Sequence, residues 1–374
     1  MSPLLLLAYL LAAVTTTWVL VGLVAILWLV ARSEAQLGPP VPVTVLKPLA
    51  GAGPDLQANL QSFFEQRHPH FQLIFGVERQ DDPAIPVVQA LMRRYPQVNA
   101  RLVIEEGAVA QNPKVSNLLK MLATARHDLL LISDAGVRAG PHYLSDLVET
   151  KLRTGAGLVT NTFVGVGETS LGAALENVQL NGFVAAGAAV PTLFADAAVV
   201  GKSMFFSRRE LEDLGGLRRV ADLLAEDFVI GKMFQHAGRS VHLGREILLS
   251  VNGSVTLRAA LDRQLRWSML RFRLRPWAYL LEPLTSPLVM AALLSGVFGP
   301  TAWVWGLALL GVRDVVQWIA LRGLGRVHLP LLLAPGRELL MLGVWLATPF
   351  VKHVAWRGHR VRLGAGTLVY ATRP

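Results

Sequence analysis

The stretch DLLLISDAG, residues 128–136, decides the fold. Residues 129–132 are apolar without interruption, which is typical of a β-strand buried on both faces of a sheet. Asp134 follows this run after a single serine. Ligands of open α/β sheets bind beyond the carboxyl ends of the strands. The stretch therefore predicts a buried strand that ends at a candidate functional site.

Other short apolar runs lie on both sides of this strand, and helical stretches separate them. Apolar runs that alternate with helices predict crossover units and a mainly parallel sheet. We therefore predict an α/β domain over residues 41–252, with its functional side chains directly after strands. The runs are VPVTVL (41–46), FQLIFGV (71–77), ARLVIE (100–105) and GLVTNTFV (157–164).

The composition is too apolar for a purely soluble enzyme, because 52% of the residues are hydrophobic and 17% are charged. An average globular protein has about 25% charged residues. The first charged residue is Arg32, and about 20 apolar residues suffice to cross a bilayer. We predict a transmembrane anchor over residues 1–32. The chain has no cysteine, which excludes disulfides, thiolate zinc sites and cysteine nucleophiles.

The positive charge of the chain is concentrated in its last third. Residues 253–275 carry six Lys or Arg against one Asp or Glu, and residues 276–374 carry nine against three. Apolar residues at helical spacing accompany this charge, so residues 253–282 are predicted to form amphipathic helices on the membrane surface. Because basic residues alternate with membrane-length apolar runs, we expect anionic lipid as the partner and no nucleic acid.

Residues 283–352 are predicted to form the C-terminal transmembrane region, followed by a basic cytoplasmic tail over 353–374. Gly299-Pro300 is a natural break, and Arg337-Glu338 is costly in mid-bilayer unless paired inside protein. We therefore favour a hairpin with a re-entrant last segment over one long crossing that later returns. The hairpin has arms 284–299 and 301–320, with 329–350 re-entrant or interfacial. The alternative crosses once at 284–312 and returns at 329–350.

Three acidic positions and one basic motif are candidates for chemistry. Asp82 follows the second strand, Asp134 follows the fourth, and Glu226-Asp227 opens an apolar helix. Further along, RQLRW (263–267) places two arginines three residues apart beside a tryptophan. Taken singly, each has an ordinary structural explanation as a turn, a helix cap or a basic stripe.

In combination and in this order, these elements resemble the membrane-associated glycosyltransferases of the GT-A fold, a nucleotide-diphospho-sugar transferase domain. The chain resembles the ceramide glucosyltransferase family, glycosyltransferase family 21, which includes bacterial hopanoid-pathway relatives. The resemblance covers nearly the whole chain. Its motifs are VTVLKPLAG (43–51), SFFEQRHP (62–69), DDPAIPVV (81–88), NPKVSNL (112–118), LLISDAGVR (130–138), GKSMFFSR (201–208), AEDF (225–228), RQLRW (263–267), LEPLTSP (281–287) and WRGHRVRLG (356–364).

The resemblance implies a donor site for a UDP-sugar. Asp82 and Lys114 are expected to hold the nucleotide, and Asp134 is expected to bind the donor through a divalent cation. Such a cation neutralises the diphosphate, and hard Mg²⁺ or Mn²⁺ calls for carboxylate oxygen ligands. Arg263 and Arg266 can supply fixed positive charge to the departing diphosphate.

On the acceptor side, the resemblance makes Asp227 the general base, which takes the proton of the attacking hydroxyl, and Trp267 a wall of the acceptor site. A single displacement with inversion at the anomeric carbon follows. Two departures bear on these roles. Asp134-Ala135-Gly136 lacks the second carboxylate of a full Asp-x-Asp motif, and the stretch Asn181–Val190 has no histidine where animal ceramide enzymes carry one.

We therefore predict an inverting hexosyltransferase that moves one sugar, glucose from UDP-glucose, to a hydroxyl of a membrane lipid, ceramide. The alternative is transfer of N-acetylglucosamine from UDP-GlcNAc to a hopanoid polyol, and the non-enzymatic alternative is an inactive membrane scaffold. The expected location is the bacterial inner membrane, with the catalytic domain facing the cytoplasm. A processive polysaccharide synthase is rejected, because the chain offers few helices with which to build a polymer channel.

Overall fold

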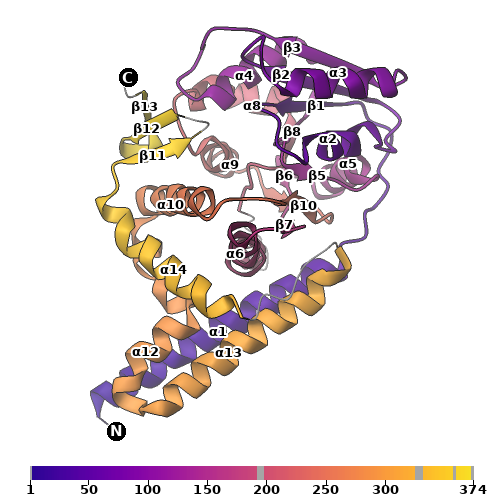
Figure 1. Ribbon diagram of the computed structural model, residues 1–374. Helices are drawn as coiled ribbons and strands as arrows, with labels where there is room; N and C mark the ends of the chain where they lie inside the picture. Colours follow the sequence, from indigo (N-terminus) through magenta and orange to yellow (C-terminus); the bar gives the residue numbers. More distant parts are fainter. Residues whose placement is uncertain (1, 192–197, 325–331, 357–358, 372–374) are drawn as a thin grey trace. The chain divides into compact units, whose positions relative to one another are not determined.

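A computed structural model describes residues 2–191, 198–324, 332–356 and 359–371 (Figure 1). The chain divides into two compact units, a sheet unit and a helical unit. The sheet unit comprises Ala31–Phe163, Pro191–Val251 and Leu368–Pro374. The helical unit comprises Met1–Val30, Val164–Val190 and Asn252–Thr367.

The sheet unit contains a seven-stranded sheet of order β3-β2-β1-β4-β8-β6-β9. The first four strands of this order pair in parallel, β8 is antiparallel to β4 and β6, and β6 is parallel to β9. The prediction of a mainly parallel α/β sheet is confirmed. The strands are β1 (Val43–Pro48), β2 (Phe71–Val77), β3 (Asn99–Ile104), β4 (Leu129–Ile132), β6 (Leu158–Thr160), β8 (Met204–Ser207) and β9 (Val241–Leu243).

The apolar run GLVTNTFV does not form one strand as predicted. It splits into β6 and β7 (Phe163–Val166), because the polar side chain of Asn161 is used in tertiary contacts at the break. Asn161 donates from Nδ2 to the carbonyl of Glu246 at 2.9 Å and accepts from the hydroxyl of Ser203 at 2.9 Å.

Helices of the sheet unit follow the strands in the expected alternation. They are α2 (Leu56–Phe64), α3 (Ala84–Arg94), α4 (Pro113–Leu122), α5 (Tyr143–Thr154), α8 (Arg208–Asp213), η3 (Leu217–Val220) and α9 (Glu226–His236). Beside the main sheet, β5 (Val137–Arg138) pairs antiparallel with β10 (Leu248–Val251).

The helical unit contains two helices that are long and apolar enough to cross a membrane, Pro3–Ala31 (α1) and Pro300–Leu324, among the residues that the structure describes. The second begins as α13 (Pro300–Leu321) and continues into η5 (Arg322–Leu324). A shorter apolar helix, α12 (Pro287–Phe298), packs with them, and Figure 1 shows α1, α12 and α13 side by side. Ala8 of α1 contacts Leu294 of α12 and Ala302 of α13 in one buried cluster.

The break at Gly299-Pro300 is confirmed, and the alternative of one continuous helix over 284–312 is wrong. Gly299 has φ 60° and ψ −144°, a conformation that ends α12 before proline starts α13. The two helices then pack closely, because a Cβ on Gly306 would lie 2.5 Å from the Cβ of Ala291. The number of crossings stays a prediction, since α12 has 12 residues and is about 18 Å long.

The remaining elements of the helical unit follow the predicted order. The region 253–282 forms two helices, α10 and α11, which Pro276 separates. The elements are α6 (Leu171–Gln179), η1 (Leu180–Val184), α7 (Ala185–Ala189), α10 (Leu257–Leu274), α11 (Pro276–Leu280), η4 (Glu282–Thr285), α14 (Ala334–Ala347), η6 (Thr348–Phe350), β11 (His353–Trp356), β12 (His359–Leu363) and η7 (Ala365–Thr367); β13 (Val369–Ala371) belongs to the sheet unit.

The predicted basic tail contains secondary structure. Within it, β11 and β12 pair antiparallel, with Val354 opposite Val361. Of the predicted segment 329–350, residues 329–331 lie outside the described residues, and α14 begins at Ala334. The cytoplasmic side of the tail stays a prediction.

Membrane topology is open to cysteine labelling, because the chain has no cysteine of its own. We expect Arg373→Cys to react with a membrane-impermeant maleimide only after cells are opened, since basic residues favour the cytoplasmic side. Ser2→Cys, before the uncharged helix α1, is the control and should react in intact cells. Reaction of Arg373→Cys in intact cells would show three full C-terminal crossings and would contradict the hairpin with a re-entrant or interfacial last segment.

Candidate active site at the edge of the sheet

The carboxyl ends of β1, β2 and β4 lie along one edge of the sheet, because these strands are parallel neighbours. Strand β8 runs the other way, with Met204 opposite Ile132, so the residues before Met204 reach the same edge. This topology brings Asp134, which follows β4, and Gly201, which precedes β8, to the same place. The sequence predicted the first of these two positions and missed β8.

Lys114 lies at the centre of this edge. Its Nζ is 2.8 Å from Oδ1 of Asp134 and 2.9 Å from Oε1 of Glu226. The same ammonium donates to the carbonyl of Gly201 at 3.3 Å, and the residue is only 7% exposed. One buried cation therefore connects residues from α4, α9 and the loops before β8 and after β4.

The position of Lys114 is fixed by Asn112, which caps the N-terminus of α4. Asn112 Oδ1 accepts from the backbone N–H groups of Lys114 at 2.8 Å and Val115 at 3.1 Å. Its Nδ2 donates to Oε2 of Glu226 at 3.2 Å and to the carbonyl of Leu223 at 2.6 Å. Asn112 thus joins the N-termini of α4 and α9. Neither Asn112 nor Glu226 has a role in the site that the sequence alone predicts.

Asp227 lies directly against Gly201. A Cβ on Gly201 would lie 2.5 Å from Oδ2 of Asp227, so only glycine fits there without displacement. Burial raises the pKa of Asp227 to about 6, and the neighbouring carboxylate of Glu226 acts in the same direction, while Lys114 opposes them. Asp227 is therefore ionised at neutral pH and more basic than an ordinary aspartate.

The pKa of Lys114 responds to the same group of charges. Burial by itself lowers this pKa, but the carboxylates of Asp134, Glu226 and Asp227 outweigh burial and raise it above its ordinary value. The ammonium therefore stays charged over the whole working range. It holds three carboxylates together that would otherwise repel one another.

Hydrogen bonds from Lys47 hold the backbone at Asp134 in place. This wholly buried side chain donates to the carbonyl of Asp134 at 2.8 Å and to the hydroxyl of Ser133 at 3.2 Å. Its ammonium also lies 3.4 Å from the ring centroid of Phe63. Burial lowers the pKa of Lys47 well below its usual range. The lysine of the VTVLKPLAG motif thus positions the aspartate.

Asp82 makes backbone contacts of a structural kind. Its two carboxylate oxygens accept from the N–H of Gly51 at 3.1 and 3.0 Å, and Oδ1 also accepts from the N–H of Ala84 at 2.8 Å. These bonds tie the loop after β1 to the start of α3. The predicted contact of Asp82 with a nucleotide stays a prediction.

The RQLRW motif lies on α10 in the helical unit. Arg263 forms an ion pair with the buried carboxylate of Glu176 on α6, while Arg266 and Trp267 are partly exposed. Asp82, Lys114, Asp134 and Asp227 belong to the sheet unit. Joint action of the two sets of residues therefore stays a prediction.

No group of three or more His, Asp or Glu side chains with metal-binding geometry occurs among the described residues. Asp134 has a side chain that is 36% exposed, so its carboxylate reaches the surface at the sheet edge. This arrangement fits a divalent cation that takes a single protein carboxylate and completes its shell with diphosphate and water oxygens.

A solved glycosyltransferase structure has a similar fold. The mannosyltransferase PcManGT from Pyrobaculum calidifontis, in complex with GDP-Man and Mn²⁺, matches over 91% of this chain and 99% of its own, with a TM-score of 0.53 and 17% identity. This likeness shows the GT-A glycosyltransferase fold. Residues 4–369 match the family Glycosyl transferase family 21, and the chain belongs to that family.

Named relatives of the chain include two ceramide glucosyltransferases. Ceramide glucosyltransferase 1 of Caenorhabditis elegans is 29% identical over 73% of this chain and 60% of its own length. The ceramide glucosyltransferase of Komagataella phaffii is 30% identical over 70% of this chain and 61% of its own length. The matched part thus spans about three fifths of each relative.

Replacement of Gly201 tests the close approach at the site. We expect Gly201→Ala to lower kcat at least tenfold, because the new Cβ would displace the carboxylate of Asp227. Gly53→Ala is the matched control, since a Cβ there meets nothing within 4 Å. Both variants are compared in a transfer assay and by thermal unfolding. Full activity of Gly201→Ala would show that Asp227 does not need its position against Gly201.

Proposed function

We propose that this chain transfers a hexose from a UDP-sugar to a hydroxyl group of a membrane lipid, with inversion at the anomeric carbon. The first donor that we propose is UDP-glucose. The observation that carries the proposal is the half-buried Asp227, with its pKa raised to about 6, beside Lys114 and Asp134 at the carboxyl edge of a GT-A sheet. The family and the names of the relatives support sugar transfer to a lipid.

Asp227 acts as the general base in this proposal. Its carboxylate accepts the proton of the acceptor hydroxyl as that oxygen forms a bond to the anomeric carbon, and the bond from this carbon to the diphosphate oxygen breaks. A pKa of about 6 suits a base at neutral pH, because the group is ionised yet basic enough to take a proton. One displacement inverts the anomeric configuration.

The donor is bound at the same edge of the sheet. Asp134 would hold Mg²⁺ or Mn²⁺, which when bound neutralises the charge that develops on the diphosphate. Asp82 and Lys114 are proposed to hold the nucleotide, and Arg263 and Arg266 to face the departing diphosphate. The Mn²⁺ in the complex of the Pyrobaculum calidifontis mannosyltransferase supports a divalent cation in this fold.

Ceramide is the proposed acceptor, and a hopanoid polyol with UDP-GlcNAc as donor is the second candidate. The second candidate is retained because Asn181–Val190 contains no histidine, whereas animal ceramide enzymes carry one in this stretch. In this stretch Asn181 hydrogen-bonds both backbone groups of Gly165, accepting at 2.7 Å and donating at 2.9 Å. The Asn181 side chain therefore stabilises the fold.

Two candidate membrane helices support an integral membrane protein. We propose that it lies in the bacterial inner membrane with the sheet unit in the cytoplasm, where UDP-sugars are made. Arg32, the first charged residue after α1, supports this orientation by the positive-inside rule.

The experiment is a panel of donors and acceptors with purified full-length protein in nanodiscs. UDP-glucose and UDP-GlcNAc are each offered with ceramide and with a hopanoid polyol, and products are weighed by mass spectrometry. We expect one hexose per lipid with one donor and one acceptor. A ladder of hexose units would show a polymerase, and no product with either donor would refute the proposed function.

A further inference from the structure

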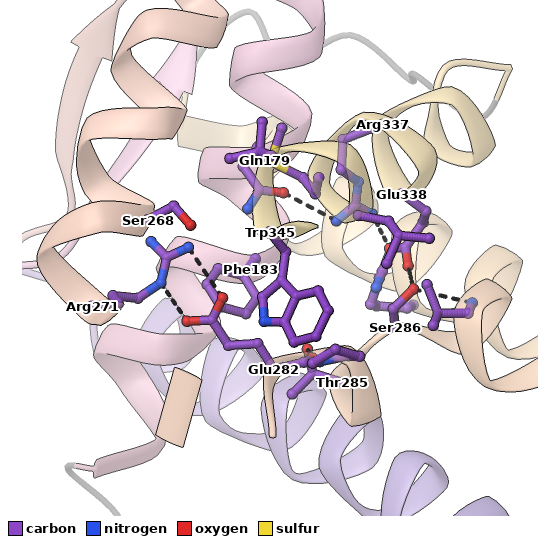
Figure 2. A pocket seen from close by; sticks show the side chains of 16 residues that line it. Gln179, Phe183, Ser268, Arg271, Glu282, Thr285, Ser286, Arg337, Glu338 and Trp345 are labelled. Carbon is purple, nitrogen blue, oxygen red and sulfur yellow. Dashed lines mark hydrogen bonds and ion pairs between the residues drawn. The ribbon is translucent and has the colours of Figure 1, made fainter. Parts of the chain in front are cut away.

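The helical unit contains a half-open cavity of about 70 Å³ that the donor chemistry does not use. Side chains from α6, η1, α10, η4, α12, α13 and α14 line it (Figure 2). An internal site for one water needs only about 10–15 Å³, so this cavity has room for a group of several heavy atoms. It lies wholly within one compact unit.

Charged side chains that are otherwise rare in membrane helices lie along one wall. Arg313 of α13 and Arg337 of α14 each place Nη2 3.0 Å from Oε1 of Glu338. Arg313 Nε also contacts Oδ1 of Asp314 at 2.9 Å. Arg337 and Glu338, which the sequence marks as costly in mid-bilayer unless paired, are thus paired inside the protein. Charges buried in a membrane region are costly to keep and mark functional sites.

Arg337 is not fully satisfied by these partners. The residue is 3% exposed, and its Nε has no hydrogen-bond partner among the residues that the structure describes. Its Nη1 reaches Oε1 of Gln179 only at 3.4 Å, a long contact that Figure 2 marks. A buried guanidinium N–H without an acceptor is expensive. An oxygen atom of a bound molecule would satisfy this N–H group.

Aromatic and apolar side chains line the cavity beside these charges. Figure 2 shows Trp345 and Phe183 between the Arg337–Glu338 pair and the Arg271–Glu282 pair, and Val289 and Met341 also belong to the lining. The indole of Trp345 is fixed, because its Nε1 donates to the carbonyl of Tyr279 at 2.9 Å and its ring stacks on that of Tyr279 at 5.7 Å. The cavity is therefore amphipathic, as a lipid with a small polar head requires.

The charges around the cavity balance. Arg271 pairs with Glu282, and the cluster of α13 and α14 contains two arginines and two acidic residues. A phosphate group would meet carboxylates as well as arginines. An uncharged head with hydroxyl or amide oxygens can accept from Arg337 Nε without upsetting the balance.

The cavity is connected through two helices to the predicted acceptor motif. Ser268, which directly follows Trp267 on α10, lines the cavity, and so does Arg271 one turn later. On α6, Gln179 lines the cavity one turn after Glu176, the partner of Arg263. The cavity and the RQLRW motif are thus built on the same two helices.

We propose that this cavity binds the uncharged polar head of the acceptor lipid, with Arg337 and Gln179 as the polar residues that determine acceptor specificity. This inference rests on the proposed function, because it assigns the second substrate of that reaction to a place in the helical unit. Arg337 Nε donates to an oxygen of the head, and the Trp345 wall receives the start of the apolar chain.

Kinetics of two conservative variants test the proposal. Gln179→Met removes an amide at nearly constant volume, and Arg337→Lys keeps the charge of the cluster but removes Nε. Each is expected to raise the KM for the lipid acceptor at least tenfold and to leave the KM for the UDP-sugar within twofold. The matched control is Gln317→Met, because Gln317 is buried in α13 but does not line the cavity. Unchanged acceptor KM in both variants, or an equal rise in the control, would overturn the proposal.

Photo-crosslinking tests occupancy without turnover. Ceramide and a hopanoid polyol, each with a diazirine near the head, are incorporated into phosphatidylcholine nanodiscs with the full chain. We expect one of them to label the peptide that contains Met341 and Trp345, and Gln179→Met to reduce the labelling. Labelling elsewhere by both probes, or displacement by phosphatidylglycerol more readily than by unlabelled ceramide and hopanoid polyol, would overturn the proposal. Labelling of this peptide without any sugar transfer would instead refute the proposed function and leave the lipid site standing.

Discussion

Asp227→Asn is expected to lower kcat by about 10²–10⁴-fold, the range for loss of a general base. An asparagine amide keeps the shape of the side chain and can still accept from the N–H of Phe228, which bonds Oδ1 at 2.8 Å in the native chain. It cannot take a proton from the acceptor hydroxyl. Because the contacts of Lys114 with Asp134 and Glu226 do not involve Asp227, binding of UDP should persist.

The measurement combines product mass spectrometry with calorimetric titration of UDP. Asp213→Asn is the matched control, since that aspartate is exposed and pairs with Arg239 at 3.1 Å on the surface. The control should keep both activity and UDP affinity. Equal turnover in Asp227→Asn and the native chain would refute Asp227 as the base, and loss of UDP binding would assign it to the donor site.

The sequence was informative where burial follows a local pattern. The run FQLIFGV matches β2 at both ends, because a strand covered on both faces is apolar at nearly every position, and Gln72 is the one exception in this strand. Asp134 was found for the same reason, since it follows such a strand. By contrast, β8 was missed although it is as long as β4, because it pairs antiparallel within a parallel sheet. Only its neighbours in the folded chain determine its direction.

The missing members of the site are joined by contacts between distant parts of the chain. Asn112 reaches Glu226 across 114 positions, and Lys114 reaches Gly201 across 87. No local periodicity in the sequence predicts contacts between residues so far apart along the chain. One signal was available, because Asn112-Pro113 has the residue types preferred at an N-cap and the first helical turn. That signal would have placed Lys114 at a helix start, but not among three carboxylates.

The cavity in the helical unit is a second case in which the sequence does not identify tertiary partners. The sequence showed that Arg337 and Glu338 need partners, and it could not name them. The structure supplies Arg313, which lies on a different helix, and leaves Arg337 Nε without an acceptor among the described residues. A local rule thus identified the energetic problem, and tertiary packing determined its solution.

Removal of the central cation is the second change with a large expected effect. Lys114→Met leaves the carboxylates of Asp134, Glu226 and Asp227 together without their common partner. Breaking a buried ion pair costs about 3–5 kcal/mol, so we expect a clear fall in Tm. We also expect kcat at pH 7 to fall at least tenfold, since loss of Lys114 raises the pKa of Asp227 and leaves less of the base ionised. Lys120→Met on the same helix is the matched control, because Lys120 is equally buried but donates to the carbonyl of Glu105.

The pH dependence of kcat separates this electrostatic effect from simple unfolding. Asp227 works as a carboxylate, so the native rate should fall as the pH falls through about 6. Lys114→Met should move the acidic limb of the pH–rate profile to higher pH in the fraction of the protein that stays folded. Glu226→Gln removes a negative charge that raises the pKa of Asp227, so it should move the limb to lower pH. Opposite shifts in the two variants are the expected result, and shifts in the same direction would contradict the electrostatic coupling of these three residues.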